Sequence, residues 1–276
     1  MALTVRTNLS AMSAYSSLNK TQSNLTDTLG RISTGLRVTK AADDAAGLGV
    51  ATKLNARATS VEQAMRNAND GISMIQTAEG STNEVSNILV RMRELAVQSS
   101  SETLADADRA YINDEFNQLS LEIGRISSVT EFNGINLSDA TTTQVSAQIG
   151  INNATTSRIT ISLGDLRSTA LGVAGSSINL ASSTAARSAI DAIDSAIDSV
   201  NAYRSTYGSI QNRLESSLSN STTYLESLRS AESQIMDADF AKESTDLTKN
   251  QIMQQAGVAA LAQAKNVNQA AVSLLN

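Results

Sequence analysis

The chain has 276 residues, a formal net charge of −6, 3% aromatic residues, and no histidine, cysteine, proline or tryptophan. Without histidine and cysteine there can be no disulfide, no thiolate nucleophile, no Cys/His zinc site and no Ser-His-Asp triad. The acidic balance argues against nucleic-acid binding and against a basic helix lying on a membrane.

The chain also lacks the signals of a membrane protein or of a protein with a cleaved leader. Its longest apolar run is far below the roughly 18–20 residues that span a bilayer, and its first twenty residues lack a basic start and an apolar core. We therefore expect no membrane insertion, no cofactor and no metal. The chain is either cytoplasmic or exported without a cleaved signal.

The first part of the chain is predicted to form long helices. Apolar residues recur at steps of three and four, which is the spacing of one helix face. The N-terminal stripe consists of Leu18, Leu25, Leu29, Ile32 and Leu36, with Gln22 as its polar exception. The same rhythm continues from Ala51 to Ile75 and from Val85 to Leu95. Absence of proline means that nothing forces a kink in these helices.

A glycine-rich segment, RISTGLRVTKAADDAAGLGVATKL, interrupts the helical pattern. It could be a phosphate loop, a metal site or a joint between two helices. No GxxxxGK[ST] motif is present, and Asp43 and Asp44 alone supply too few ligands for a metal. Glycine permits non-helical backbone angles and aspartate caps helices. We therefore interpret Gly35, Asp43, Asp44 and Gly47 as a joint.

In the middle of the chain, apolar residues stop recurring at helical spacing and instead recur at every second position. Asn133-Gly134 predicts a tight turn. Apolar and polar residues alternate from Val145 to Ile151 and from Ile159 to Leu163, on either side of the polar NNATTS. This pattern predicts a β-hairpin at about 143–165. The residues from about 170 to 185 are predicted to be a loop, after which helical spacing returns.

The last segment is apolar on two sides. The C-terminal stripe consists of Met253, Gly257, Ala260, Ala264, Val267, Ala271 and Leu274, and a second stripe of Val258, Leu261, Val272 and Leu275. A helix apolar on two sides needs partners on two sides. One chain folding back supplies one partner, so neighbouring copies would supply the other. A well-covered intramolecular bundle remains the alternative from periodicity alone. Either way the fold is mainly α, a long antiparallel coiled-coil rod formed by both termini with a small β-hairpin in the middle.

Several long motifs in order carry a family resemblance. The segments NLSAMSAYSSLNKTQSNLTDTLGRISTGLRVTKAADDAAGLGVATKL, VRMRELAVQSS, EFNGINL and AESQIMDADFAKESTDLTKNQIMQQAGVAALAQAKNVNQAAVSLL resemble bacterial flagellin over essentially the whole chain. The resemblance implies a discontinuous inner coiled-coil domain, 1–44 with 236–276, and an outer helical domain, 45–235. The chain lacks the large outer domains that many flagellins carry.

The resemblance also implies a function and partners. The chain would polymerise with itself into an extracellular, hollow flagellar filament. It would meet the flagellar export apparatus, an export chaperone, and the filament cap and hook-junction proteins. In VRMRELAVQ, matching residue by residue implies that Arg91 and Leu95, with Glu115 from the following helix, contact neighbouring subunits and a vertebrate Toll-like receptor. The family's usual glutamine before the first arginine is Val90 here.

Three other functions compete with this one. A hook–filament junction protein would share the terminal motifs but diverge in ELAVQ and FNG. A cytoplasmic signalling coiled coil would share the alanine-rich heptads but not the β-hairpin. An enzyme is the least favoured, because an HExxH zinc protease motif cannot exist without histidine.

Overall fold

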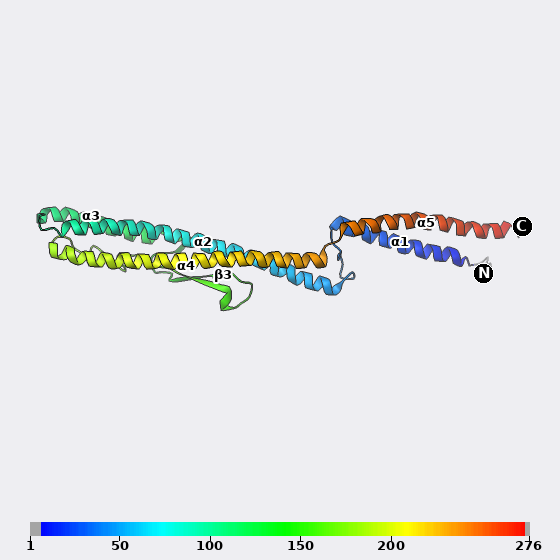
Figure 1. Cartoon of the computed structure of the whole chain (residues 1–276), viewed down its shortest axis with the longest axis horizontal. Coiled ribbons are helices and arrows are strands. Elements are labelled where there is room, and N and C mark those ends of the chain that lie inside the picture. The colour runs from blue at the N-terminus through cyan, green and yellow to red at the C-terminus, as the bar shows by residue number, and fades with distance from the viewer. Residues whose placement is uncertain (1–6, 274–276) are drawn as a thin grey trace. The chain divides into compact units, whose positions relative to one another are not determined.

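The computed structural model describes residues 7–273, with side chains as far as residue 266. It is mainly helical, which confirms the predicted fold class (Figure 1). The helices are α1 (Leu9–Thr34), α2 (Ala45–Ser99), α3 (Asp106–Val129), α4 (Ser183–Met236) and α5 (Phe240–Ser273). Packing divides the chain into a terminal unit, Met1–Ala58 with Glu226–Asn276, and a middle unit, Thr59–Leu225. The predicted boundaries at 44/45 and 235/236 lie near helix ends, whereas the compact units divide inside α2 and α4.

Helix α1 has a side-chain cap at one end and a glycine at the other. The Asn8 side-chain oxygen accepts a hydrogen bond from the Ala11 N–H at 2.9 Å. Gly35 ends the helix with a φ of 70°, and its N–H donates to the Arg31 carbonyl at 2.8 Å. This left-handed conformation suits glycine. The N-terminal stripe was predicted to continue in one helix to Leu36, and this is wrong: Leu36 follows the cap and pairs with Asp237 in an isolated β-bridge.

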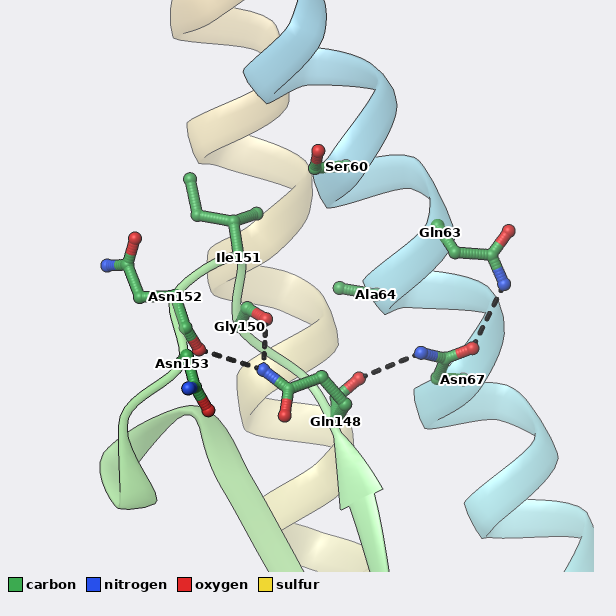
Figure 2. A pocket seen from close by; sticks show the side chains of 9 residues that line it. All are labelled: Ser60, Gln63, Ala64, Asn67, Gln148, Gly150, Ile151, Asn152 and Asn153. Atoms are coloured by element: carbon green, nitrogen blue, oxygen red, sulfur yellow. Dashed lines mark hydrogen bonds between the residues drawn. The ribbon is translucent and has the colours of Figure 1, made fainter.

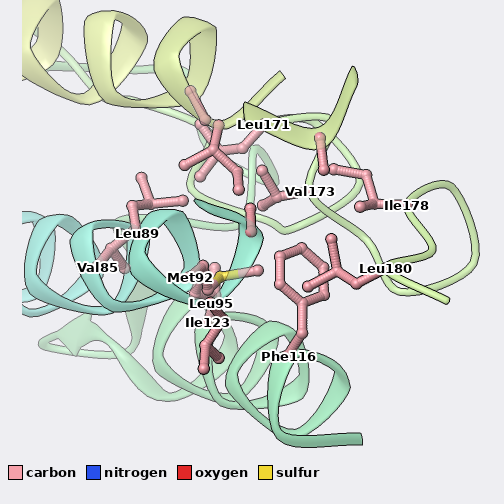
Figure 3. Packing of buried hydrophobic residues seen from close by; sticks show 14 of the residues in the cluster. Val85, Leu89, Met92, Leu95, Phe116, Ile123, Leu171, Val173, Ile178 and Leu180 are labelled. Atoms are coloured by element: carbon pink, nitrogen blue, oxygen red, sulfur yellow. The ribbon is translucent and has the colours of Figure 1, made fainter. Parts of the chain in front are cut away.

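The larger core of the middle unit joins three helices and an irregular segment. Side chains of α2 and α3, such as Met92 and Phe116, meet side chains of α4, such as Ile193, and all three are fully buried. Figure 3 shows Leu171, Val173, Ile178 and Leu180 packed against the same helices. The segment predicted as a loop at about 170–185 is irregular, but α4 already begins at Ser183 and the apolar side chains of the segment are part of the core.

Two small antiparallel pairs of strands complete the middle unit. Strands β1 (Glu131–Phe132) and β2 (Ile135–Asn136) flank Asn133 and Gly134, whose φ values of 50° and 75° make the predicted tight turn. Strands β3 (Gln144–Gln148) and β4 (Arg158–Ser162) pair with Val145 opposite Ile161, which confirms the predicted hairpin. A short 3-10 turn, η1 (Thr155–Ser157), precedes β4.

Two tyrosines of α4 hold the segment that follows β4. The Tyr207 hydroxyl is buried and accepts a hydrogen bond from the Gly164 N–H at 2.9 Å. Burial raises the pKa of Tyr207 above its usual value. A Cβ added to Gly164 would lie 2.6 Å from the ring of Tyr203, so only glycine fits in this position.

Basic residues are divided unequally between the two units. Every lysine belongs to the terminal unit, and the middle unit contains arginine as its only basic residue. The lysine side chains are all exposed, at Lys20, Lys40, Lys53, Lys242, Lys249 and Lys265. The cationic surface of the middle unit is therefore made entirely of guanidinium groups.

Candidate assembly site

Helices α1 and α5 of the terminal unit lie side by side and run antiparallel (Figure 1). At one end of the pair, the Asn8 side-chain nitrogen donates to the carbonyl of Ala264 at 2.9 Å. At the other end, Arg31 forms an ion pair of 3.5 Å with Glu243, whose side chain is only 8% exposed. The order of these partners along the two helices fixes the antiparallel register.

The surface between α1 and α5 is rich in polar groups. The residues of α1 that are buried are Thr21, Leu25 and Thr28. Asn250 of α5 is buried too, and its side-chain nitrogen lies 3.4 Å from the Thr28 hydroxyl. Polar groups that are buried need partners, so these contacts favour one register more than they add hydrophobic stability.

One glycine allows a close approach between the two helices. A Cβ added to Gly257 of α5 would lie 3.2 Å from Cδ1 of Leu18 of α1. Leu18 is a member of the predicted N-terminal stripe, and Gly257 is a member of the predicted C-terminal stripe. Leu261, from the second stripe, and Ala264, from the C-terminal stripe, are half-buried about one and two helical turns farther along α5. The contact with α1 therefore draws on both stripes of α5.

Other predicted stripe residues do not take part in this contact. Leu29 is 49% exposed and Met253 48% exposed, and Ala260 is exposed as well, whereas Ile32 is half-buried. Side chains of Val267 and Ala271, and the whole of Leu274, lie outside the described residues. The assembly role of these stripes stays a prediction.

A set of large apolar side chains remains uncovered on the α1 and α5 pair. We call it the exposed apolar surface. Its members extend along both helices and are 48–74% exposed: Leu9, Met12, Tyr15 and Leu29 of α1, and Phe240, Ile252, Met253 and Val258 of α5. Large contiguous apolar patches on a protein surface mark interaction sites.

The segment between α1 and α2 is held by backbone and carboxylate contacts. The Arg37 N–H donates to the Met236 carbonyl at 2.6 Å, and the Ala238 N–H donates to the Gly35 carbonyl at 2.9 Å. These bonds tie the segment to the residues between α4 and α5. The role of Gly35, Asp43, Asp44 and Gly47 as a joint stays a prediction.

The two aspartates of this segment each act locally. Asp43 accepts hydrogen bonds from the backbone N–H groups of Lys40 and Thr39 and from the Thr39 hydroxyl, and these bonds hold the pKa of Asp43 below its usual value. The Asp44 carboxylate accepts from the Gly47 N–H at 2.7 Å and so caps the start of α2. Neither carboxylate has a cation at ion-pair distance in the described residues.

The predicted contact residues of α2 and α3 differ in their exposure. Arg91 is exposed and forms an ion pair of 2.8 Å with Glu115 of α3 and one of 3.0 Å with Glu94. Hydrogen bonds to Glu115 and Glu94 raise the pKa of Arg91. Leu95 is 1% exposed and belongs to the core that Figure 3 shows. A direct surface contact through the Leu95 side chain was predicted, and it is wrong, because the core covers that side chain.

One pocket of the middle unit lies between α2 and the residues that follow β3. Figure 2 shows a pocket of about 390 Å³ lined largely by amides, in which Asn67 donates to the Gln148 carbonyl at 3.0 Å. Nowhere in residues 7–273 do three or more acidic, cysteine or histidine side chains gather in a way that could hold a metal ion. Among the same residues, no helix is long and apolar enough to cross a bilayer.

Comparison with known proteins gives a consistent result along the chain. A family model described as the bacterial flagellin N-terminal helical region matches residues 5–143. The corresponding model of the bacterial flagellin C-terminal helical region matches residues 190–275. A flagellin of Halalkalibacterium halodurans is 44% identical over 268 residues, which cover 97% of this chain and 98% of that protein.

A second relative and one solved structure agree. The flagellar filament 33 kDa core protein of Treponema phagedenis is 38% identical over 283 residues, covering 97% of this chain and 98% of that protein. The crystal structure of Bacillus cereus flagellin is similar with a TM-score of 0.50 and 32% identity, over 56% of this chain and 88% of that one.

Proposed function

The chain belongs to the bacterial flagellin family and is a structural subunit of the flagellar filament, not an enzyme; from this premise we propose that it polymerises through the exposed apolar surface of α1 and α5. The observation that carries the proposal is the exposure of the eight large apolar side chains of α1 and α5 that make up this surface. The hook–filament junction protein and the signalling coiled coil gain no supporting observation.

The energetics favour association once most of this surface is covered. Fully burying one large apolar side chain contributes roughly 1.5–3 kcal/mol. Because the side chains of this surface are already partly covered, at 48–74% exposure, burying six of the eight would contribute roughly 5–11 kcal/mol. The freedom that a subunit loses on association costs roughly 4–15 kcal/mol. The balance becomes favourable only when several neighbours cover the surface together. This requirement suits a polymer better than a dimer.

The partners in assembly follow from the family. Flagellin self-assembles into the filament, which is extracellular. The subunit would reach it through the flagellar export apparatus, after release from an export chaperone, and would add between the filament cap and the hook-junction proteins. An unpaired apolar helix face is the feature that a chaperone would cover before export. We place the boundary of the assembly domain at the joint of Gly35, Asp43, Asp44 and Gly47.

A second contact is proposed for the surface of α2 and α3. Arg91 and Glu115 would meet a neighbouring subunit in the filament and a vertebrate Toll-like receptor outside it. Their exposure and their mutual ion pair support a preorganised polar surface. Leu95 would act on this surface only by anchoring α2, the helix that also carries Arg91, in the core, and Val90 of the same helix is an exposed apolar neighbour of Arg91.

A matched pair of substitutions tests the main proposal. Val258→Ser removes an apolar side chain that is 54% exposed on α5, and Val129→Ser removes one that is 57% exposed on the middle unit. Seeded assembly, followed by light scattering and electron microscopy, should slow strongly for Val258→Ser and little for Val129→Ser. Both monomers should keep the same circular dichroism. Equal assembly rates of the two variants would overturn the proposal.

A further inference from the structure

The groove between the β3–β4 hairpin and α4 has an unusual charge. It measures about 640 Å³ and is lined by residues of η1, β4 and α4, among them Thr155, Thr156, Arg158, Asn212 and Arg213. Two of its lining residues are arginines and none is a carboxylate. The chain as a whole carries a net charge of −6, so this groove opposes the average charge of the protein.

The arginines of the groove differ from most others in the middle unit. An ion pair with a carboxylate neutralises each of six arginines there: Arg91, Arg93, Arg109, Arg125, Arg167 and Arg187. In the described structure neither Arg158 nor Arg213 has a carboxylate at ion-pair distance. The positive charge of the groove is therefore left uncompensated within the chain.

Arg158 is nevertheless held in place. Its Nε donates to Oε1 of Gln148 at 3.0 Å, and its Nη2 donates to Oδ1 of Asn153 at 2.8 Å. Gln148 is fixed in turn, because its side-chain nitrogen donates to the carbonyls of Gly150 at 2.7 Å and Asn152 at 3.0 Å (Figure 2). Both acceptors of Arg158 are neutral amides, so they orient the guanidinium without cancelling its charge. Of its five N–H donors, three make no bond in the described structure.

From this arrangement we infer that the groove binds the acidic groups of a polysaccharide, whose carboxylates or sulfates pair with Arg158 and Arg213. A guanidinium presents its donors in a fork that matches the two oxygens of such an anion. The hydroxyls of Thr155 and Thr156 and the amide of Asn212 line the same groove, and they suit the hydroxyls of a sugar ring. The lining contains no aromatic ring on which a nucleic-acid base could stack.

We infer a polymeric ligand because the protein itself is polymeric. Two exposed arginines bind one anion weakly in water, because solvent and salt screen the charges. A filament repeats the groove in every subunit, and a polysaccharide repeats its acidic group in every unit. Several weak contacts on one strand then raise the overall affinity without any new contact.

The test uses the full-length monomer and charge reversal of one groove arginine. Polygalacturonate is titrated at a salt concentration of about 20 mM, where screening is weak. Arg213→Glu should lower the affinity by about tenfold or more, because it replaces an attraction with a repulsion. Arg204→Glu is the matched control: it makes the same change on the same helix outside the groove, and should stay within about twofold of the unchanged protein. Circular dichroism spectra of both variants should match that of the unchanged protein, which checks that they are folded.

Titrations with other polymers and with a free anion test which kind of ligand the groove binds. Neutral dextran should not bind, and dextran sulfate should bind with the same dependence on Arg213. Equal binding of single-stranded DNA, or binding of free sulfate without binding of polygalacturonate, would overturn the inference. So would an equal loss of affinity in Arg213→Glu and Arg204→Glu. The monomer assay does not depend on polymerisation, so its failure is distinct from a failure of the proposed assembly surface. Filaments should bind polygalacturonate more tightly than monomers, and filaments that do not bind it would contradict the inference.

Discussion

The carboxylate of Asp44 occupies the space that a Cβ of residue 47 would need, and it accepts a hydrogen bond of 2.7 Å from the Gly47 N–H. Gly47 thus makes room for the group that caps its own helix. The two residues should be coupled energetically, and a double-mutant cycle measures that coupling.

We expect Asp44→Ala to destabilise the protein by about 1 kcal/mol through loss of the cap. In a Gly47→Ala background, where the methyl group has already displaced the carboxylate, the same change should cost much less. Gly49→Ala is the control, because a Cβ there meets nothing within 4 Å, and in that background Asp44→Ala should keep its full cost. Urea unfolding followed by circular dichroism gives the loss of unfolding free energy that Asp44→Ala causes in each of the three backgrounds. An equal loss in the Gly47→Ala background and in the unchanged protein would contradict the coupling.

Gly35 should tolerate no β-branched residue. Its φ of 70° ends α1 in the left-handed region, which costs roughly 1–2 kcal/mol for other residues. We expect Gly35→Val to slow filament assembly more than it changes the unfolding of the middle unit, since the change alters the exit of the chain from α1. Gly30→Val provides the comparison at a helical glycine of the same helix. Assembly at an unchanged rate in Gly35→Val would refute the role of this residue as a joint.

Tyr207 should make the stability of the middle unit depend on alkaline pH. Burial raises the folded-state pKa of Tyr207, so the folded state favours the neutral hydroxyl. This contribution is complete below the unfolded-state pKa of about 10 and is lost as the pH rises through the folded-state value. Unfolding measured at pH 8 and above pH 10 should show the loss.

Tyr207→Phe should remove the loss of stability at alkaline pH, but it should also lower the stability at neutral pH. The buried Gly164 N–H loses its acceptor, which should cost about 1–3 kcal/mol at neutral pH. The Tyr203→Phe variant serves as the control, because the Gly164 N–H donates its hydrogen bond to the hydroxyl of Tyr207. A variant that is as stable as the unchanged protein at neutral pH, or one that keeps the full alkaline loss, would contradict this account.

Leu95 should behave as a core residue. It is 1% exposed, and truncating such a leucine to alanine typically costs about 2–5 kcal/mol because a cavity remains. Val97→Ala, at a side chain that is 48% exposed on the same helix, should cost far less. Thermal unfolding of the two variants distinguishes the alternatives, and similar melting temperatures would restore Leu95 as a surface residue.

The sequence patterns anticipated the regular elements and failed where the packing is irregular or polar. Spacing of three and four located α2 and α4, and alternation located the β3–β4 hairpin. Leu171 and Val173 belong to the core without any period, because an irregular backbone has no fixed side-chain direction. The apolar stripes also missed Thr28 and Asn250, since an interface that uses hydrogen bonds is invisible to a search for apolar residues. The apolar spacing from Val85 to Leu95 placed Leu95 on the buried face of its helix, as the structure does. Only the role implied by the family resemblance suggested that Leu95 lies at the surface.

The distribution of lysine has a practical consequence for chemistry on the intact protein. An amine-reactive dye or cross-linker finds lysine side chains only in the terminal unit, where all six are exposed. A protease that cleaves after lysine would likewise leave Thr59–Leu225 in one piece. The accessibility of these amines therefore reports on the terminal unit alone: any subunit contact that covers them protects them from labelling, while the middle unit contributes no background signal.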